Sequence, residues 1–250
     1  MQEYQIQQFR IFRALGFAFR AWFRNFIPFT LLGGLLYSPM FIWLFTRPAE
    51  MGTGPDQFDS YFNTVFVYPI YMLTAATTLI APLLTYRIVQ QLNGTRVSMG
   101  TSLVFGLRGI PTALLIAVIN AVLGFAPFGG IATMVLGCIW FVATPAAVAE
   151  KLGPFRAMSR SSELTSGRRW GIFGLTLLIG VIAVIVGAII LYPMLYELDG
   201  FALVRRAAMW VLIVVCVLQM FSAMVAAVSY ALLRKDKEGM TDDQLARIFE

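Results

Sequence analysis

Long apolar runs alternate along the chain with short segments that carry most of the charge. Six stretches free of Asp, Glu, Lys and Arg fall at about 26–45, 61–86, 111–128, 130–149, 170–192 and 207–233. Each has roughly the 20 mostly apolar residues that a helix needs to cross the hydrocarbon layer. The sequence APFGG (126–130) divides the third stretch from the fourth, because proline and paired glycines break helices. The pattern predicts an all-α polytopic membrane protein with six transmembrane helices.

Composition points to the same class of protein. Of 250 residues, 59% are hydrophobic and 13% are charged, whereas soluble domains have about 45–50% apolar and about 25% charged residues. A soluble core of this size could not hide so much apolar surface. The N-terminal MQEYQIQQFR has no basic start followed by an apolar run and a cleavage site, so we expect no signal peptide.

The distribution of basic residues predicts the orientation. Sixteen of the 19 Lys and Arg residues lie in the N-terminal segment, the 86–110 and 150–169 loops and the C-terminal tail. The opposite side has only Arg47, Arg205 and Arg206. Because basic loops are retained in the cytoplasm, both termini are predicted to be cytoplasmic. The net charge of +6 would then lie at the inner face, which favours anionic lipids over nucleic acid as partners.

The segment 6–25 predicts an amphipathic helix in front of the first span. On a helical wheel, its aromatic and aliphatic residues fill one continuous arc, with Phe17 as the exception. Arg10, Arg13, Arg20 and Arg24 cluster on another arc. Such a helix is expected to lie in the membrane interface with its rings toward the acyl chains and its arginines near phosphates. A helix that binds a soluble partner is the alternative.

A second polar segment, AMSRSSELTSGRRWGIFGL (157–175), precedes the fifth span. Gly153-Pro154 suits a helix start and Gly167 a helix end. Arg156, Arg160 and Glu163 are spaced for a ladder of ion pairs on one face. This segment is either an amphipathic elbow or a phosphate site in which Arg156, Arg160, Arg168 and Arg169 hold a lipid headgroup.

Each odd-numbered span follows a short helix-compatible stretch that ends in basic residues. This recurrence suggests three parallel repeats at about 6–88, 96–150 and 153–234, each an interfacial helix followed by a transmembrane hairpin. A capping box at Thr241–Gln244 predicts a further short helix over 241–249.

The region around the second polar segment resembles a bacterial family. The residues that carry the resemblance are Glu150, Ala157, Arg160, Ser161, Leu164, Gly167, Trp170 and Phe173, together with the ending YALLRKDKEG. This pattern is similar to that of YciC-type proteins and of the membrane domain attached to some glycerophosphoryl diester phosphodiesterases. The resemblance covers about the last 110 residues, and the first half shares only the architecture. It implies a six-span protein of the bacterial inner membrane without the catalytic phosphodiesterase domain.

Residues suited to catalysis or metal binding are scarce. The chain has no histidine, and Cys138 and Cys216 lack the spacing of metal ligands. We expect no cofactor, no metal and no enzymatic activity. The predicted spans contain no ionisable residue, which disfavours ion-coupled transport. The strongest polar groups at membrane depth are Asn120 and Gln219, whose simplest role is an interhelical hydrogen bond.

The sequence therefore predicts a lipid-interacting scaffold or accessory component whose basic helices contact anionic headgroups, with self-association possible. The alternative is an oligomeric channel or an uncoupled transporter for lipid or a small solute. That alternative requires a polar pathway that includes Asn120, Gln219 or the Thr74, Thr77 and Thr78 cluster.

Overall fold

The computed structural model describes residues 11–46, 62–92, 98–124, 129–192 and 200–238, and within these ranges the chain is helical and contains no strand. In chain order the elements are α1 (Ile11–Arg24), α2 (Phe26–Thr46), the π-helix η1 (Asn63–Val67), α4 (Tyr68–Leu92), α5 (Met99–Gly106), the 3₁₀-helix η2 (Leu107–Gly109), α6 (Ile110–Gly124), α7 (Gly129–Ile139), α8 (Ala143–Ala149), α9 (Pro154–Thr165), α10 (Arg169–Leu191) and α11 (Gly200–Glu238). Three of the predicted features lie outside the described residues. They are the helix over 241–249, residues 126–128 of the APFGG turn, and Arg10.

The described chain contains six helical segments that are long and apolar enough to cross a membrane. They are Phe26–Thr46, Asn63–Gln90, Gly100–Leu123, Gly129–Ala149, Arg169–Ile189 and Arg206–Glu238. The prediction of an all-α, six-span membrane protein is therefore confirmed. The last helix is longer than predicted. At 39 residues, α11 is about 58 Å long, roughly twice the thickness of the hydrocarbon layer.

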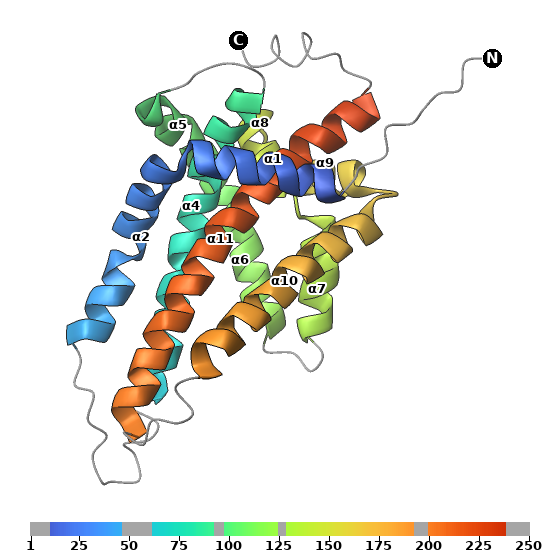
Figure 1. Ribbon diagram of the computed structural model, residues 1–250. Helices are drawn as coiled ribbons and strands as arrows, with labels where there is room; N and C mark the ends of the chain where they lie inside the picture. Colours follow the sequence, from blue (N-terminus) through green and yellow to red (C-terminus); the bar gives the residue numbers. More distant parts are fainter. Residues whose placement is uncertain (1–10, 47–61, 93–97, 125–128, 193–199, 239–250) are drawn as a thin grey trace.

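The long helices run side by side, whereas α5 and α8 gather at one end of the bundle and α9 lies toward that end (Figure 1). We call this the basic end, because Arg87, Arg108 and the charged residues of α9 lie there. A short helix precedes each of the three hairpins: α1 before α2 and α4, α5 before α6 and α7, and α9 before α10 and α11. This order is the one that the three-repeat hypothesis requires, and superposition of the three units remains its test.

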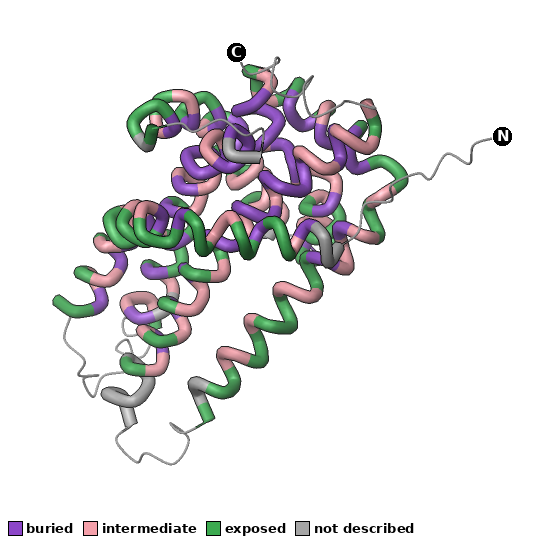
Figure 2. Tube along the Cα trace, turned by 45° about the horizontal axis from the view of Figure 1, so that its top comes forward, coloured by how far each residue is buried: buried purple, intermediate pink, exposed green. Residues whose placement is uncertain are grey.

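The core forms mainly where α4 and α11 pack together. Ile80, Leu84 and Ile88 on α4 face Met224 and Val228 on α11, all with at most 1% of their surface exposed. Burial is concentrated toward the basic end, and α10 is largely uncovered (Figure 2). The uncovered side of α10 is entirely aliphatic over Val181–Ile189, so its natural solvent is the acyl region of a bilayer.

Helix α1 lies across α11 rather than in line with α2 (Figure 1). The corner between α1 and α2 is Asn25, a residue with 1% exposure. Its Nδ2 donates to the Ala21 carbonyl at 2.9 Å, and its Oδ1 accepts from Nε of Arg87 at 2.9 Å. Asn25 therefore ties the end of α1 to α4.

Some aromatic side chains of α1 pack against the protein and others are exposed. The sequence had predicted that all of them face acyl chains. Phe19 and Trp22 lie with their ring centroids 4.8 and 5.8 Å from that of Phe221 on α11. Phe23 stays 69% exposed. The fully buried face of α1 consists of Ala14 and Ala18, because only small side chains allow the helix to lie this close to α11.

The fourth span is broken, which corrects the prediction of a continuous helix over 130–149. Helix α7 ends at Ile139 and α8 begins at Ala143. Pro145, in the first turn of α8, has no N–H to bond to the carbonyl four residues earlier, and a first turn is where a helix tolerates this loss. Pro82, by contrast, stays inside the continuous helix α4.

Candidate functional site

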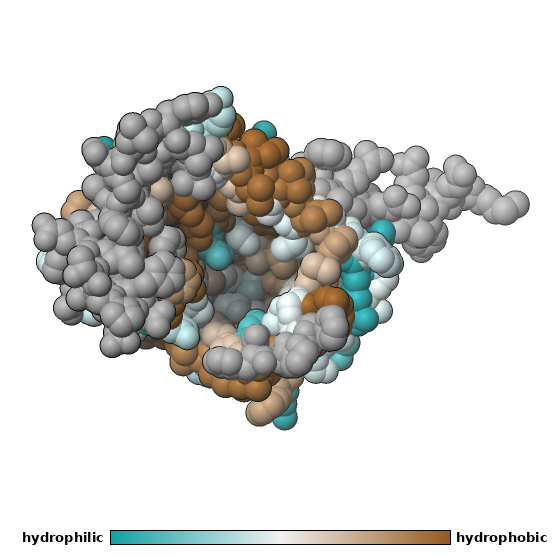
Figure 3. All heavy atoms as spheres, turned by 90° about the horizontal axis from the view of Figure 1, so that it is seen from below, coloured by the Kyte–Doolittle hydropathy of each residue, from teal (hydrophilic) through white to brown (hydrophobic). Residues whose placement is uncertain are grey.

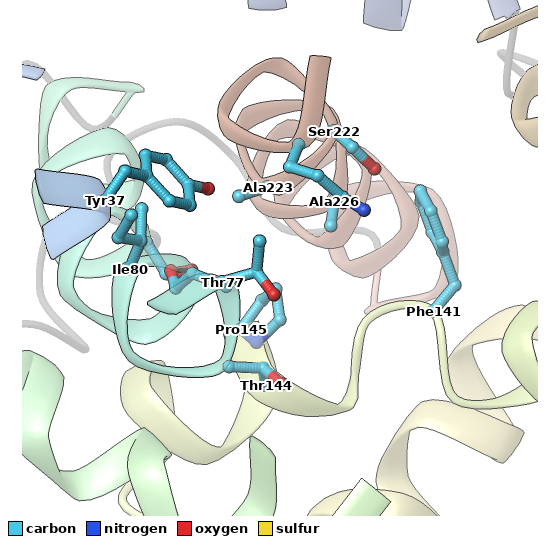
Figure 4. A pocket seen from close by; sticks show the side chains of 12 residues that line it. Tyr37, Thr77, Ile80, Phe141, Thr144, Pro145, Ser222, Ala223 and Ala226 are labelled. Carbon is cyan, nitrogen blue, oxygen red and sulfur yellow. Dashed lines mark hydrogen bonds between the residues drawn. The ribbon is translucent and has the colours of Figure 1, made fainter. Parts of the chain in front are cut away.

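A cavity of about 190 Å³ lies inside the bundle between α2, α4, α8 and α11 (Figure 4). Its lining is Tyr37 from α2; Thr77, Ile80, Ala81 and Thr85 from α4; Phe141, Thr144 and Pro145 at the helix break; and Gln219, Ser222, Ala223 and Ala226 from α11. Five of the six hydroxyl and amide side chains among them, all but Thr85, are in the middle part of their spans or at the break. The cavity is thus a polar site at membrane depth.

The most informative polar group is the hydroxyl of Tyr37. Tyr37 is 3% exposed, and its Oη has no hydrogen-bond partner within the described part of the chain. The hydroxyl points across the cavity toward Ala223 (Figure 4). An unsatisfied buried hydroxyl costs about 1–3 kcal/mol, so a molecule that bonds to Tyr37 Oη would recover this free energy.

The threonines of the lining are already partly satisfied. Thr77 Oγ1 donates to the Thr74 carbonyl at 2.9 Å, and Thr85 Oγ1 donates to the Ala81 carbonyl at 2.7 Å. Each donor is used within α4, while the oxygen keeps acceptor capacity. The twelve lining residues include no carboxylate, ammonium or guanidinium group. The site is therefore suited to an uncharged polar ligand, because a charge at this depth would have no counter-ion.

The break between α7 and α8 supplies one wall of the cavity. Phe141 and Thr144 come from the break and from the first turn after it (Figure 4). Irregular backbone is tolerated at membrane depth where it is buried in protein or lines a cavity. Here Ser161 Oγ donates to the Ile139 carbonyl at 2.8 Å and accepts from the Val142 N–H at 3.3 Å. Through Ser161, helix α9 thus fixes the backbone conformation of the break between α7 and α8.

The cavity is partly open. Viewed from the end opposite α5 and α8, the surface has a hollow with hydrophobic residues on its rim and hydrophilic residues in its depth (Figure 3). Toward the basic end, one turn beyond Ala226, Tyr230 is 1% exposed, and a further turn along α11, Arg234 is 6% exposed. Buried side chains therefore close the bundle on that side.

These closing residues belong to a network that we call the Glu150 network, formed by Glu150, Arg160, Tyr230, Arg234 and Glu238. Nε of Arg160 donates to both carboxylate oxygens of Glu150 at 3.1 Å, and the Tyr230 hydroxyl donates to Glu150 Oε1 at 2.8 Å. Arg234 donates to Glu238 Oε2 at 2.9 Å and to the Tyr230 hydroxyl at 3.2 Å. Arg160 also pairs with Glu238. Two arginines and two glutamates balance in charge and join α8, α9 and α11.

The structure separates the four arginines that the sequence grouped as a phosphate site. Arg160 is in the Glu150 network, and Arg168 Nη2 lies 3.1 Å from Asp236 Oδ2. Arg156 and Arg169 are exposed. This segment is therefore an elbow in which Arg160 and Arg168 form ion pairs with α11. The long last helix brings Asp236 and Glu238 beside α9, although these residues are 68 and 78 positions away from the arginines in the sequence.

Of the arginines predicted on the first helix, Arg20 and Arg24 are exposed on α1. Arg10 and the side chain of Arg13 lie outside the described residues. The motif residues Ala157, Ser161 and Leu164 are at most 1% exposed, and Gly167 has a positive φ of 78° that favours glycine after a helix end. These residues serve the packing of α9 and the turn that follows it.

The two polar residues predicted at membrane depth have different surroundings. Gln219 lines the cavity together with Thr77. Asn120 is not among the lining residues, and its Oδ1 is buried and accepts no hydrogen bond from the described residues. Sequence reasoning missed Tyr37, Thr144 and Ser222, since a single hydroxyl in an apolar run gives no signal that it faces a cavity.

Within the described residues, no group of three or more Cys, Asp and Glu side chains could hold a metal ion. Comparisons with protein-family models, with curated proteins and with solved structures found no match for this chain.

Proposed function

We propose that this chain is a non-enzymatic membrane protein that binds a small uncharged polar solute in the cavity and carries it across the membrane without ion coupling. This develops the alternative that the sequence left open, with Gln219 and Thr77 in the roles expected of a polar pathway. The proposal places the chain in a bacterial inner membrane with both termini cytoplasmic, which the family resemblance and the distribution of basic residues support.

The observation that carries the proposal is the hydroxyl of Tyr37, which lies at the wall of a polar cavity and has no hydrogen-bond partner among the described residues. A folded protein rarely leaves a buried hydroxyl unsatisfied without a functional reason or a bound molecule. A cavity of about 150 Å³ holds a molecule the size of benzene, so the 190 Å³ cavity has room for a small polyol or amide. A broken helix beside a site at membrane depth is also a feature of transporters.

The arrangement of the two ends supports a carrier that opens to one side at a time. The hollow faces the end with few basic residues, and the Glu150 network closes the basic end. Transport would require α8 and α9 to separate from α11, which would break the hydrogen bond of Glu150 with Tyr230 and its 4.0 Å ion pair with Arg234. A channel open at both ends is not the state that this structure describes.

A flux measurement tests the proposal. Purified protein is reconstituted into liposomes, and entry of radiolabelled erythritol is compared with entry into protein-free liposomes. We expect faster entry with the wild-type protein and loss of the difference with Ser222→Trp, which fills the cavity. The matched control is Val184→Trp on the lipid-facing side of α10, where 72% exposure leaves room for the ring. Equal rates for wild-type and Ser222→Trp proteins would overturn the proposal.

A second measurement does not depend on the choice of solute. In a Cys138→Ala/Cys216→Ala background, Thr77→Cys is treated with a membrane-impermeant methanethiosulfonate added from the side opposite the basic end. We expect Thr77→Cys to react and Val184→Cys, which faces lipid, to remain unmodified. Protection of Thr77→Cys from the reagent would show that the hollow does not lead to the cavity.

A second candidate function is the lipid-interacting accessory role predicted from the sequence. It is favoured by the exposure of Arg20 and Arg24 beside the 69% exposed Phe23 on α1, since rings and guanidinium groups on one surface helix suit the membrane interface. In this case phosphatidylglycerol should raise the melting temperature of the wild-type protein more than that of Arg20→Gln/Arg24→Gln. An equal rise in both proteins would exclude this role for α1.

A further inference from the structure

A second cavity, separate from the polar one, lies on the outside of the bundle between α7 and the first turns of α10. Its volume is about 400 Å³. Met134, Val135, Cys138 and Ile139 of α7 line one side, and Arg169, Trp170 and Phe173 of α10 line the other. We call it the α7–α10 groove. Apart from Arg169, its side chains are apolar or weakly polar, so its body suits a hydrocarbon chain.

The one charged residue lies at one end of the groove. Arg169 is the first residue of α10, whereas Phe173 is a full turn deeper into the apolar span. Nη2 of Arg169 is 3.4 Å from Ser162 Oγ on α9, and no carboxylate in the described ranges lies within ion-pair distance of it. The neighbouring Arg168 turns the other way, to Asp236. Arg169 is therefore the guanidinium of this pair that is available to an anion outside the protein.

The surroundings of Arg169 are those of a membrane interface. Trp170 is 85% exposed and makes an edge-on contact with Phe173 at 6.0 Å between ring centroids. Exposed tryptophan at the end of a span is typical of the headgroup level. The groove extends from this level along α7, where Met134 and Val135 are about half exposed. Its wall would thus contact lipid tails directly.

We infer that the α7–α10 groove binds a membrane glycerophospholipid, with the phosphate on Arg169 and one acyl chain along α7. A guanidinium donates two hydrogen bonds to two phosphate oxygens, and the Ser162 hydroxyl lies close enough to add a third. One end of the groove supplies a cation for the phosphate, and the rest supplies a hydrocarbon surface for the acyl chain. This order matches the order of phosphate and acyl chain in a phospholipid. The inference holds whether or not the inner cavity carries a solute.

Native mass spectrometry of the detergent-solubilised protein with added phosphatidylglycerol tests the site. We expect Arg169→Gln to weaken lipid binding about tenfold, as loss of a charge-assisted hydrogen bond implies. The affinity of Arg169→Lys should lie between those of the wild-type protein and Arg169→Gln. The control is Arg156→Gln, another exposed cation, on α9, which should leave binding unchanged. Equal weakening by both glutamine variants would mean that the lipid responds only to net charge, and the site would be wrong.

A second pair of measurements tests the acyl part. Diacylglycerol, which lacks the phosphate, should bind Arg169→Gln as well as the wild-type protein. Val135→Trp should weaken the binding of both lipids, because its ring occupies the groove. Val184→Trp, on the far part of α10, should leave the binding of both lipids unchanged. Both tryptophans replace exposed residues, so folding is preserved and is checked by the melting temperature. Unchanged binding to Val135→Trp would overturn the inference.

Discussion

Arg160 on α9 donates from Nε to both carboxylate oxygens of Glu150, the residue that follows α8, at 3.1 Å. The same guanidinium pairs with Glu238 near the end of α11. One arginine therefore joins three helices at the basic end, beside the turn of α11 that closes the polar cavity. An arginine so engaged has little capacity left for a lipid phosphate.

The first prediction concerns this ion pair. Glu150→Gln should destabilise the protein by about 1–3 kcal/mol, because it leaves Arg160 and the buried Arg234 with one carboxylate fewer. This value is smaller than that for a fully buried ion pair, because Arg160 is partly exposed to solvent. Thermal unfolding in detergent measures the effect. Glu163→Gln is the control, since its side chain is 65% exposed and its pairing with Arg160 is weak. A larger loss with Glu163→Gln would contradict this account of the Glu150 network.

The second prediction concerns the helix break. Ser161→Ala should cost about 1–3 kcal/mol, because the Ile139 carbonyl and the Val142 N–H each lose a partner inside the protein. The exposed Ser159 on the same helix provides the control, and Ser159→Ala should change stability by less than about 0.5 kcal/mol. The midpoint of denaturation by guanidinium in mild detergent is the readout. Similar midpoints for the two alanine variants would rule out this role of Ser161.

The third prediction concerns the contact between α5 and α4. A methyl group added at Gly106 would lie 2.6 Å from Leu83 Cα and 2.9 Å from the Pro82 carbonyl oxygen. Backbone cannot yield as a side chain can, so Gly106→Ala should lower stability by about 1–3 kcal/mol. Gly100→Ala, on the same helix but with nothing closer than 4.0 Å, should be neutral or stabilising. The melting temperatures of the two variants decide between these outcomes.

The fourth prediction concerns the corner between α1 and α2. Asn25→Ala removes the acceptor of the Arg87 Nε–H and the donor to the Ala21 carbonyl, so α1 should loosen from the bundle. Hydrogen–deuterium exchange should rise in Ile11–Arg24 and stay unchanged in α10. Asn25→Asp keeps an acceptor for Arg87 and should show a smaller rise. Uniform exchange changes across all helices would indicate global destabilisation instead.

The sequence by itself determined the class of the protein and the number of its spans. Uncharged runs of about 20 residues have one stable solution in lipid, a helix that satisfies its own backbone. For the same reason the start of α2 at Phe26 and of α10 at Arg169 agrees with prediction to within one residue. These features depend only on local composition.

Only the tertiary structure decided which polar residues come together. Tyr37, Thr144 and Ser222 lie on three different helices, and their approach depends on packing angles that no local pattern encodes. The same holds for Arg160, whose partners Glu150 and Glu238 are 10 and 78 residues away. The sequence showed basic residues at a membrane edge. The fold turned Arg160 and Arg168 inward to carboxylates and left Arg169 outward, because each side chain's partner depends on the helix packed beside it.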